Sequence, residues 1–334
     1  MAVSIYDIAK ETQLSCETIL EGLISPSSLE PEIVRFVMKT IGESGYLETF
    51  SRWKTDKRGS AVAVLIPMFD SGAGIEIFKG MDRVMSALGL NTSMVAFPTR
   101  FSTSYREDLL SGFLRFNMLD AVIAMNLVPD AETIEKFAKL GKPLVLLQAT
   151  AAGAQSVLLE NQKGMSIGIN YLFSKGCREI ALLNGPSSGN EPGTVPSERI
   201  IGYLTAIKRL GLPFDESLVF ETADYEAASG IQAFEYFHKR GKMPDAVFCA
   251  SGDMTAIGFI NAAHNMGLRV PEDISVMGYD DLPLASVVTP SLTTIRQRLM
   301  IAGAGALVLA LESAVNGQGE NLVIMPELVI RGSA

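Results

Sequence analysis

A strand–turn–helix unit recurs along the chain from residue 61 onward, and this recurrence constrains the possible folds more than any other feature. The first unit is a short apolar run at residues 61–66, followed by a glycine-containing turn and an amphipathic helix over residues 75–88. Apolar runs that alternate with helices predict parallel sheets covered by helices on both faces. The number of units exceeds what one compact sheet holds, so we expect two α/β lobes that bind a ligand at the carboxyl ends of their strands.

The same pattern predicts the remaining elements of this region. Further strands are expected at residues 91–97, 121–124, 144–147, 180–183, 246–249 and 275–277. Further helices are expected at residues 105–116, 132–140, 163–174, 198–210, 227–238, 254–265 and 296–315.

The first 46 residues have a different pattern, which predicts a small all-α domain. Short helices are expected at residues 5–11, 16–23 and 31–41. Ser4 and Ser15 can cap the first two of these helices, and only a short turn separates them, as in a helix-turn-helix. Residues 47–60 are polar and lack clear periodicity, so we interpret them as a linker.

Composition and charge exclude several classes of protein. Hydrophobic residues make up 48% of the chain and charged residues 19%, which excludes a largely disordered protein. The formal net charge of −9 makes the whole molecule repel nucleic acid unless it carries a local basic patch. No run reaches about 18 uninterrupted apolar residues and no secretory signal is visible, so we expect no membrane partner and a cytoplasmic location. The 3 cysteines are widely spaced, which argues against a disulfide framework.

The chain offers few residues for catalysis, metal binding or cofactor binding. His238 and His264 are its 2 histidines, and neither has metal-ligand spacing to cysteines or carboxylates. No G-x-S-x-G or Walker sequence occurs. Gly72-Ala-Gly74 is interpreted as a turn, because Ile77 stands at the sixth position of a dinucleotide motif. We therefore expect no enzyme activity, no metal and no cofactor.

Several polar residues follow predicted strands or open helices, where a ligand cleft is expected. They are Asp70, Gln148, Arg199, Tyr225, Asp253 and Asp280. Carboxylates, an amide and a bidentate arginine around an aromatic face suit a polyhydroxylated small molecule such as a sugar or nucleoside. The alternative is that these side chains are strand-end caps and salt bridges between the lobes.

Short sequence runs then identify a family resemblance. They lie at residues 5–18, 45–46, 176–180, 267–280, 289–297 and 326–333. The most specific is Gly267-Leu-Arg-Val-Pro-Glu-Asp-Ile-Ser-Val-Met-Gly-Tyr-Asp280. Together these runs resemble the LacI/GalR family of bacterial transcription regulators over essentially the whole chain.

The resemblance implies a helix-turn-helix domain and a two-lobed, periplasmic-binding-protein-like core made of parallel sheets. The implied parts are a DNA-binding domain at 1–46, a hinge at 47–60, and a core at 61–334 with lobe 1 at about 61–158 and 293–319 and lobe 2 at 159–292 and 320–334. Members of the family are typically homodimers through the core, and they bind a small effector between the lobes.

The resemblance also implies roles for the polar residues of the core. Arg199 and Asp280 match the family's effector-binding arginine and aspartate, and Tyr225 matches a stacking aromatic. Gln148 stands where an aspartate is usual. The family's pair of aromatics after the first core strand is replaced by Ala73-Gly74, so a more open pocket with a bulkier or differently posed ligand is expected.

The DNA-binding end departs further from the family. The family reads bases from its second helix at positions that are here Cys16, Glu17 and Glu21, with Leu20 where a phosphate-contacting serine is common. Residues 1–46 carry three basic and seven acidic side chains, a net charge of 3 − 7 = −4. Since phosphate neutralisation supplies most non-specific DNA affinity, this acidic charge opposes binding.

The linker carries a compensating positive charge. Residues 47–60 have a net charge of +2, from four basic and two acidic side chains. In the family this segment forms a hinge helix that wedges a leucine into the minor groove. Here Phe50 or Trp53 can act as the wedge, or instead rest on the core as a surface aromatic. The residues implied in DNA contact are Tyr6, Ser15, Cys16, Glu17, Thr18, Glu21, Arg52, Trp53 and Lys54.

These observations predict a ligand-responsive transcription regulator. A homodimer would present two heads to a roughly palindromic double-stranded DNA operator, and effector capture would change DNA affinity. The alternative is a cytoplasmic sugar-binding sensor whose DNA-binding head has degenerated and which acts through a protein partner.

Overall fold

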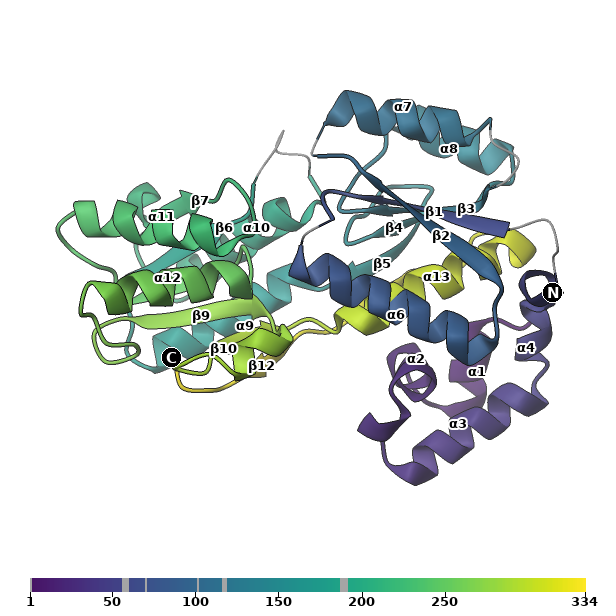
Figure 1. Ribbon diagram of the computed structural model, residues 1–334, viewed down its shortest axis with the longest axis horizontal. Helices are drawn as coiled ribbons and strands as arrows, with labels where there is room; N and C mark the ends of the chain where they lie inside the picture. The colour runs from purple at the N-terminus through teal and green to yellow at the C-terminus, as the bar shows by residue number, and fades with distance from the viewer. Residues whose placement is uncertain (1, 56–59, 70, 101, 116–118, 187–191) are drawn as a thin grey trace. The chain divides into compact units, whose positions relative to one another are not determined.

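The computed structural model describes residues 2–55, 60–69, 71–100, 102–115, 119–186 and 192–334. The chain forms two compact units. Unit 1 comprises Met1–Asp70, Gly74–Leu158 and Leu299–Ile324, and unit 2 comprises Ser71–Ala73, Leu159–Arg298 and Met325–Ala334. Within the described residues each unit holds one six-stranded sheet (Figure 1). The predicted fold class, a helical N-terminal region followed by a parallel α/β core, is confirmed.

The sheet of unit 1 has the strand order β11-β5-β4-β3-β1-β2. Its strands are β1 (Ser60–Ile66), β2 (Thr92–Pro98), β3 (Leu119–Met125), β4 (Leu144–Leu147), β5 (Gln155–Leu159) and β11 (Leu322–Ile324). The pairs from β2 through β5 are parallel. Helices α7 (Thr103–Phe113) and α8 (Ala131–Lys139) cover one face, and α6 (Gly72–Leu88) and α13 (Leu299–Asn316) cover the other (Figure 1).

The sheet of unit 2 has the order β12-β10-β9-β8-β6-β7. Its strands are β6 (Ile180–Asn184), β7 (Val219–Glu221), β8 (Ala246–Cys249), β9 (Ser275–Asp280), β10 (Thr293–Arg296) and β12 (Glu327–Val329). Its helices are α9 (Asn161–Ser174), α10 (Val195–Arg209), α11 (Ala227–Lys239) and α12 (Asp253–Asn265). Strand β12 runs antiparallel to β10, and the neighbouring pairs from β10 through β7 are parallel.

Alternating side chains of the central strand β8 show why this sheet needs both of its helix layers. Val247 and Cys249 pack in a core with α11 and α12. Ala246 and Phe248 point to the opposite face and pack with α9 and α10. Because both faces of the strand are apolar, its sequence is a continuous hydrophobic run rather than an alternating one.

Helix α13 is long and apolar enough to cross a membrane by length and composition, and 72% of that apolar window is buried inside the protein. It packs against β3 and β4 of the unit 1 sheet and against a helix of the N-terminal region. Gly303 allows a close approach to the backbone of α6 at Ile77, where a side chain would clash. These contacts identify α13 as a core helix of unit 1.

The N-terminal region is helical and belongs to unit 1. Its helices are α1 (Ile5–Thr12), α2 (Cys16–Ile24), α3 (Pro31–Glu43), α4 (Tyr46–Thr49) and α5 (Ser51–Thr55). Ser4 forms a capping box with Asp7, and Ser15 caps α2 by accepting from the backbone of Thr18, so both predicted caps are confirmed. The segment 47–60, which lacks clear periodicity and is interpreted from the sequence as a linker, is helical over most of residues 47–55, in α4 and α5.

Candidate functional site

A buried arginine forms the centre of a polar group at the carboxyl edge of the unit 2 sheet. Arg199, near the start of α10, is 4% exposed. Its Nε donates to Asn161 Oδ1 at 2.9 Å, its Nη1 donates to the carbonyl of Ala250, and its Nη2 lies 3.8 Å from Asp280 Oδ1. The guanidinium also stacks 3.9 Å above the centre of the Tyr279 ring. This set of contacts holds the guanidinium in one orientation.

Asp280 is the carboxylate partner in this group. It is the last residue of β9 and has a φ of 112°, a backbone conformation that non-glycine residues rarely adopt. Gln297 donates from Nε2 to Asp280 Oδ1 at 2.5 Å. Burial raises the pKa of Asp280 to about 6, while the nearby charge of Arg199 acts in the opposite direction. The carboxylate is therefore held in a strained, partly desolvated position beside a fixed cation.

Two buried amide oxygens at the same edge have no hydrogen-bond partner among the described residues. They belong to Asn184, the last residue of β6, and to Gln297, which follows β10. The amide nitrogen of Asn184 is already used, because it donates to the carbonyl of Pro196 at 3.0 Å. Leaving a buried acceptor unsatisfied costs about 1–3 kcal/mol, so such atoms are normally met by water or a ligand. Both oxygens can accept from a ligand hydroxyl.

Tyr225 completes the group with an aromatic ring. A side chain at Gly185 would meet Tyr225 Cε1 at 2.7 Å, so the ring lies directly against the backbone beside Asn184. Burial raises the pKa of the Tyr225 phenol to about 12, with the charges of Arg199 and Asp280 acting on it as smaller effects. The structure thus brings together Arg199, Tyr225 and Asp280, three members of the predicted set.

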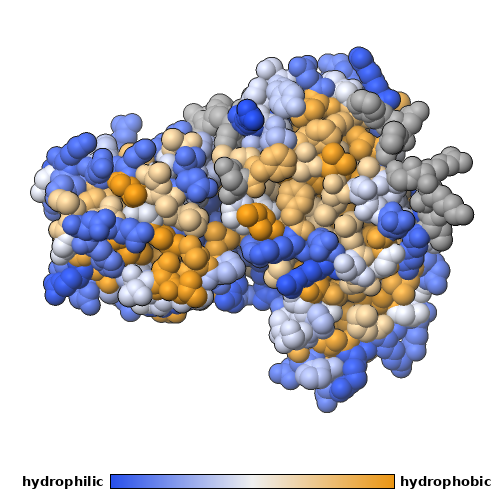
Figure 2. Space-filling view, in the orientation of Figure 1, coloured by the Kyte–Doolittle hydropathy of each residue, from blue (hydrophilic) through white to orange (hydrophobic). Residues whose placement is uncertain are grey.

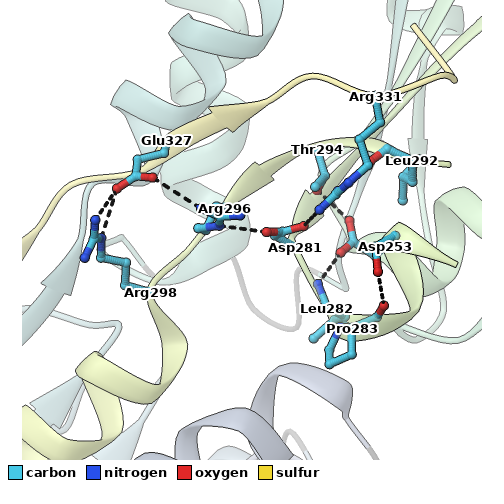
Figure 3. Close-up of polar contacts among 11 residues, drawn as sticks. Asp253, Asp281, Leu282, Pro283, Leu292, Thr294, Arg296, Arg298, Glu327 and Arg331 are labelled. Atoms are coloured by element: carbon cyan, nitrogen blue, oxygen red, sulfur yellow. Dashed lines mark hydrogen bonds and ion pairs between the residues drawn. The ribbon is translucent and has the colours of Figure 1, made fainter. Parts of the chain in front are cut away.

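Asp253 has a different set of contacts. It is fully buried at the start of α12, and its Oδ1 accepts from Thr294 Oγ1 at 2.6 Å. Its Oδ2 accepts from the backbone N–H of Leu282 at 2.6 Å (Figure 3). Burial, with the charge of Asp280 as a second cause, raises its pKa well above the usual range. These contacts favour a positioning role for Asp253 over the direct effector contact that the sequence predicted.

The residue after Asp280 anchors the loop through ion pairs. Asp281, also at positive φ, accepts from Arg296 Nε at 2.7 Å and from Arg331 Nη2 at 2.6 Å. Glu327 pairs with Arg298 and lies 3.6 Å from Arg296 Nη1, which extends the network along β10 and β12 (Figure 3). Asp281, Arg296 and Arg331 all belong to unit 2, so these ion pairs are not the salt bridges between lobes that the alternative prediction described.

Two predicted effector residues, Gln148 and Asp70, belong to unit 1. Gln148 follows β4 in unit 1, is half-buried at a φ of 59°, and donates its backbone N–H to the carbonyl of Val157 at 2.9 Å. Asp70 lies outside the described residues. Their contact with an effector stays a prediction.

The predicted DNA-contacting residues of the helices lie partly against the rest of unit 1. Tyr6 donates from its hydroxyl to the carbonyl of Glu320 at 2.9 Å. Cys16 and Glu17 are half-buried, and Glu21 accepts from Ser28 Oγ at 2.8 Å. Of the predicted positions in this region, Ser15 is exposed.

The linker residues differ from the prediction. Trp53 is fully buried in unit 1, and its carbonyl accepts from the backbone N–H of Asn91 at 2.7 Å. Phe50 is also fully buried, so in this structure neither ring is a surface aromatic or free to enter a minor groove. Arg52 pairs with Asp120 at 2.8 Å, and Lys54 is half-buried. The physical reason is that a large ring gains more from burial in the adjacent core than from solvent exposure.

Sequence reasoning missed the partners of Arg199 and Asp280. Asn184 directly follows the strand predicted at residues 180–183, so the rule that selected the other strand-end residues also applies to it. Gln297 lies in a run that carries the family resemblance. Asn161 gave no signal of its own, because an asparagine at a helix start is usually a cap. Among the described residues, no cluster of three or more metal-ligating side chains occurs.

Comparisons with known proteins show which proteins the chain is similar to. Residues 169–334 match the periplasmic binding protein-like domain. The chain is 27% identical to catabolite control protein A of Priestia megaterium over 92% of both chains. It is 26% identical to the HTH-type transcriptional repressor CytR of Escherichia coli (strain K12) over 99% of this chain and 96% of the relative. The chain is therefore similar over almost its whole length to bacterial transcription regulators.

A solved structure agrees with this assignment. A LacI family regulator from Lactobacillus casei with bound glucose is 25% identical and superposes with a TM-score of 0.71. The match covers 82% of this chain and 100% of that chain. The LacI-family resemblance predicted from the sequence is therefore confirmed, and these relatives are named as regulators rather than as enzymes.

Proposed function

We propose that this LacI-family protein regulates transcription in response to a neutral, polyhydroxylated effector of the sugar or nucleoside class. The observation that carries the proposal is the polar group at the carboxyl edge of unit 2. A fixed guanidinium and a carboxylate lie there beside two buried amide oxygens that have no hydrogen-bond partner in the part of the chain that the structure describes. The relative from Lactobacillus casei, solved with bound glucose, supports the same ligand class.

The chemistry of this group favours a neutral ligand over a charged one. Arg199 and Asp280 largely compensate each other's charge, so the edge offers no net charge to attract an ion. The free amide oxygens accept hydrogen bonds and the guanidinium donates them, which matches hydroxyl groups that do both. The face of Tyr225 can stack on a sugar ring or a base. Binding rather than catalysis is the proposed role, with no cofactor or metal.

The proposal includes a cytoplasmic homodimer that binds a double-stranded DNA operator. Strand β2 ends the unit 1 sheet and pairs with β1 on one side. Figure 2 shows apolar side chains over this edge of the sheet, where Val95 is 40% exposed. An unpaired sheet edge with an apolar surface supports self-association there.

A second candidate function is the sensor that acts through a protein partner. The observation that favours it is the burial of Leu20 and Ile24 on α2, the helix that reads DNA in this family. In that case effector binding would persist and operator binding would be lost.

Two measurements on the purified full-length chain test these candidates. Thermal shift and calorimetry against a panel of sugars and nucleosides are expected to identify a ligand that raises the melting temperature. Fluorescence anisotropy with duplex fragments from upstream of the protein's own gene, at two salt concentrations and with each ligand, then measures operator binding. Specific binding that weakens with salt supports the regulator. Ligand binding without DNA binding under all conditions supports the sensor, and binding of no panel member contradicts the effector proposal.

A further inference from the structure

One face of α2 carries an apolar stripe that includes Cys16 and Leu20, two of the positions where the family contacts DNA. Cys16, Leu20 and Ile24 are spaced four residues apart, so they lie on the same side of the helix. Leu20 and Ile24 are buried, and Cys16 is half-buried. Leu20 stands where a phosphate-contacting serine is common in the family. The surface that would approach DNA is therefore a packing surface in this chain.

Helix α13 of the same unit covers this stripe. The two helices pack together, and a side chain added at Gly305 would lie 3.3 Å from Leu20 Cδ1. The missing side chain at Gly305 thus makes room for Leu20 and for Leu322 beside it. A helix covered in this way cannot enter a major groove, which must receive the same face.

A buried carboxylate joins α13 to two other parts of the head, which we define as residues 2–55. Glu312, seven residues beyond Gly305 on α13, is 5% exposed. Its Oε1 accepts from the backbone N–H of Ile5 at 2.8 Å and from Tyr46 Oη at 2.8 Å. These donors begin α1 and α4, so one side chain ties two helices of the head to the core.

Two further contacts hold the head at its edges. Arg83 of α6 donates from Nη1 to the carbonyl of Ile24 at 3.2 Å and to Ser25 Oγ at 3.0 Å, which places a cation at the carboxyl end of α2. The backbone of Ala2 exchanges two hydrogen bonds with the side chain of Asn316, at 3.0 and 3.1 Å. The head is thus held by both apolar and polar contacts.

We propose that the head is autoinhibited, because α13 covers part of the DNA-contacting surface of α2. Operator binding then requires release of the head from the rest of unit 1. This inference rests on the proposed function as a DNA-binding regulator. The buried Glu312 makes the contact reversible, because its polar group is better solvated in the released state. Release exposes the apolar α2 stripe to water, and the acidic head repels DNA phosphates. The contacts made with DNA must therefore offset both the exposure and the repulsion.

The test uses a matched pair of variants at Glu312 in the full-length chain. Glu312→Leu leaves the donors of Ile5 and Tyr46 buried without an acceptor, which penalises the docked state alone. Glu312→Gln keeps an acceptor oxygen and serves as the control. Arg83→Ala is a second releasing variant, on a side chain that lies outside the head and is not in the apolar core.

Release is measured independently of DNA. Cys16 is half-buried whereas Cys177 and Cys249 are buried, so alkylation of Cys16, followed by mass spectrometry, reports on exposure of α2. Hydrogen exchange of the α2 amides gives a second measure. We expect slow labelling in the wild type and in Glu312→Gln, and labelling at least tenfold faster in Glu312→Leu, with a smaller increase in Arg83→Ala.

DNA affinity is then measured by anisotropy with the upstream duplex fragments. Autoinhibition predicts that affinity rises at least tenfold in Glu312→Leu and not in Glu312→Gln. Equal Cys16 labelling in all variants would overturn the docking contact, and faster labelling without a gain in affinity would overturn its inhibitory role. If variants with faster Cys16 labelling bind no duplex at either salt concentration, the proposed DNA-binding function fails as well. The labelling result shows whether the head was docked, so the two failures can be told apart.

Discussion

The carboxyl edge of unit 2 and the head region of unit 1 each contain a buried carboxylate, and the two carboxylates have different partners. Asp280 lies beside the guanidinium of Arg199, and burial raises its pKa to about 6 against the effect of that cation. Glu312 has neutral donors, Tyr46 and the backbone of Ile5, and burial raises its pKa to about 8. The first carboxylate remains mostly charged at neutral pH, and the second is mostly neutral.

This difference separates a binding site from a packing contact. The unit 2 group keeps charged side chains at a sheet edge, together with amide oxygens that have no hydrogen-bond partner among the described residues. The free energy lost by burying these oxygens unpaired is regained when a ligand donates hydrogen bonds to them. The head contact uses a neutral acid among apolar side chains, which holds two protein segments together. Changes in the two regions should therefore affect different observables.

Trp53→Ala is expected to have the largest effect on stability. Removing a fully buried indole between the head and the unit 1 sheet should lower the free energy of unfolding by about 3–5 kcal/mol. Phe36→Ala is the control, because that ring is 46% exposed and its loss should change stability by less than about 0.5 kcal/mol. Chemical denaturation measures both. A small loss for Trp53→Ala would show that the ring is not buried in solution.

Arg199→Lys is expected to act on effector binding. An ammonium cannot reproduce the planar contacts to Asn161, Ala250 and Asp280, so affinity for the identified ligand should fall about 100-fold, which is about 2.7 kcal/mol. Arg209→Lys, at the exposed end of the same helix, should leave affinity unchanged. Calorimetry distinguishes the two, and equal affinities would remove Arg199 from the site.

The pH dependence of stability should report Glu312. Its pKa in the folded protein is raised above the unfolded value, so its contribution is fully present below about pH 4.5 and is lost as the pH rises toward 8. Between pH 6 and 8 the loss should be about 2 kcal/mol in the wild type and should be reduced in Glu312→Gln. The groups that face or surround this carboxyl are Asp7, Tyr6, Cys16, Tyr46 and Glu320.

Denaturation curves of both proteins across this pH range provide the measurement. If the free energy of unfolding changes with pH in the same way in both proteins, the docked head does not bury Glu312 in solution.

Arg52→Ala is expected to have the smallest effect. Its ion pair with Asp120 is at 2.8 Å, but the arginine side chain is 59% exposed, so the pair should contribute less than about 1 kcal/mol to unfolding. If the released linker contacts DNA phosphates, the same variant should make the plot of the logarithm of the binding constant against the logarithm of the salt concentration shallower by about one unit of slope. An unchanged slope would exclude Arg52 from the DNA interface.

Local features of the sequence predicted most of the secondary structure. The caps at Ser4 and Ser15 set the starts of α1 and α2, and the apolar run that became β8 was predicted with its observed bounds. The residue pattern missed the short strands β5, β7, β10, β11 and β12, since three to five residues carry too little periodicity to identify a strand. The expectation that Arg199, Tyr225 and Asp280 lie together came from the family resemblance and from the shared carboxyl edge of parallel strands.

The sequence by itself determined that α2 has an apolar face and that residues 1–46 are acidic, because periodicity and charge are properties of the local chain. Only the tertiary structure decided what that face contacts. A stripe of Cys16, Leu20 and Ile24 can be buried by any matching apolar surface, and the space at Gly305 on α13, almost 300 residues away, is what accepts it. Hydrophobic burial is non-directional, so the partner is selected by shape and by polar contacts such as those of Glu312, which no local pattern encodes.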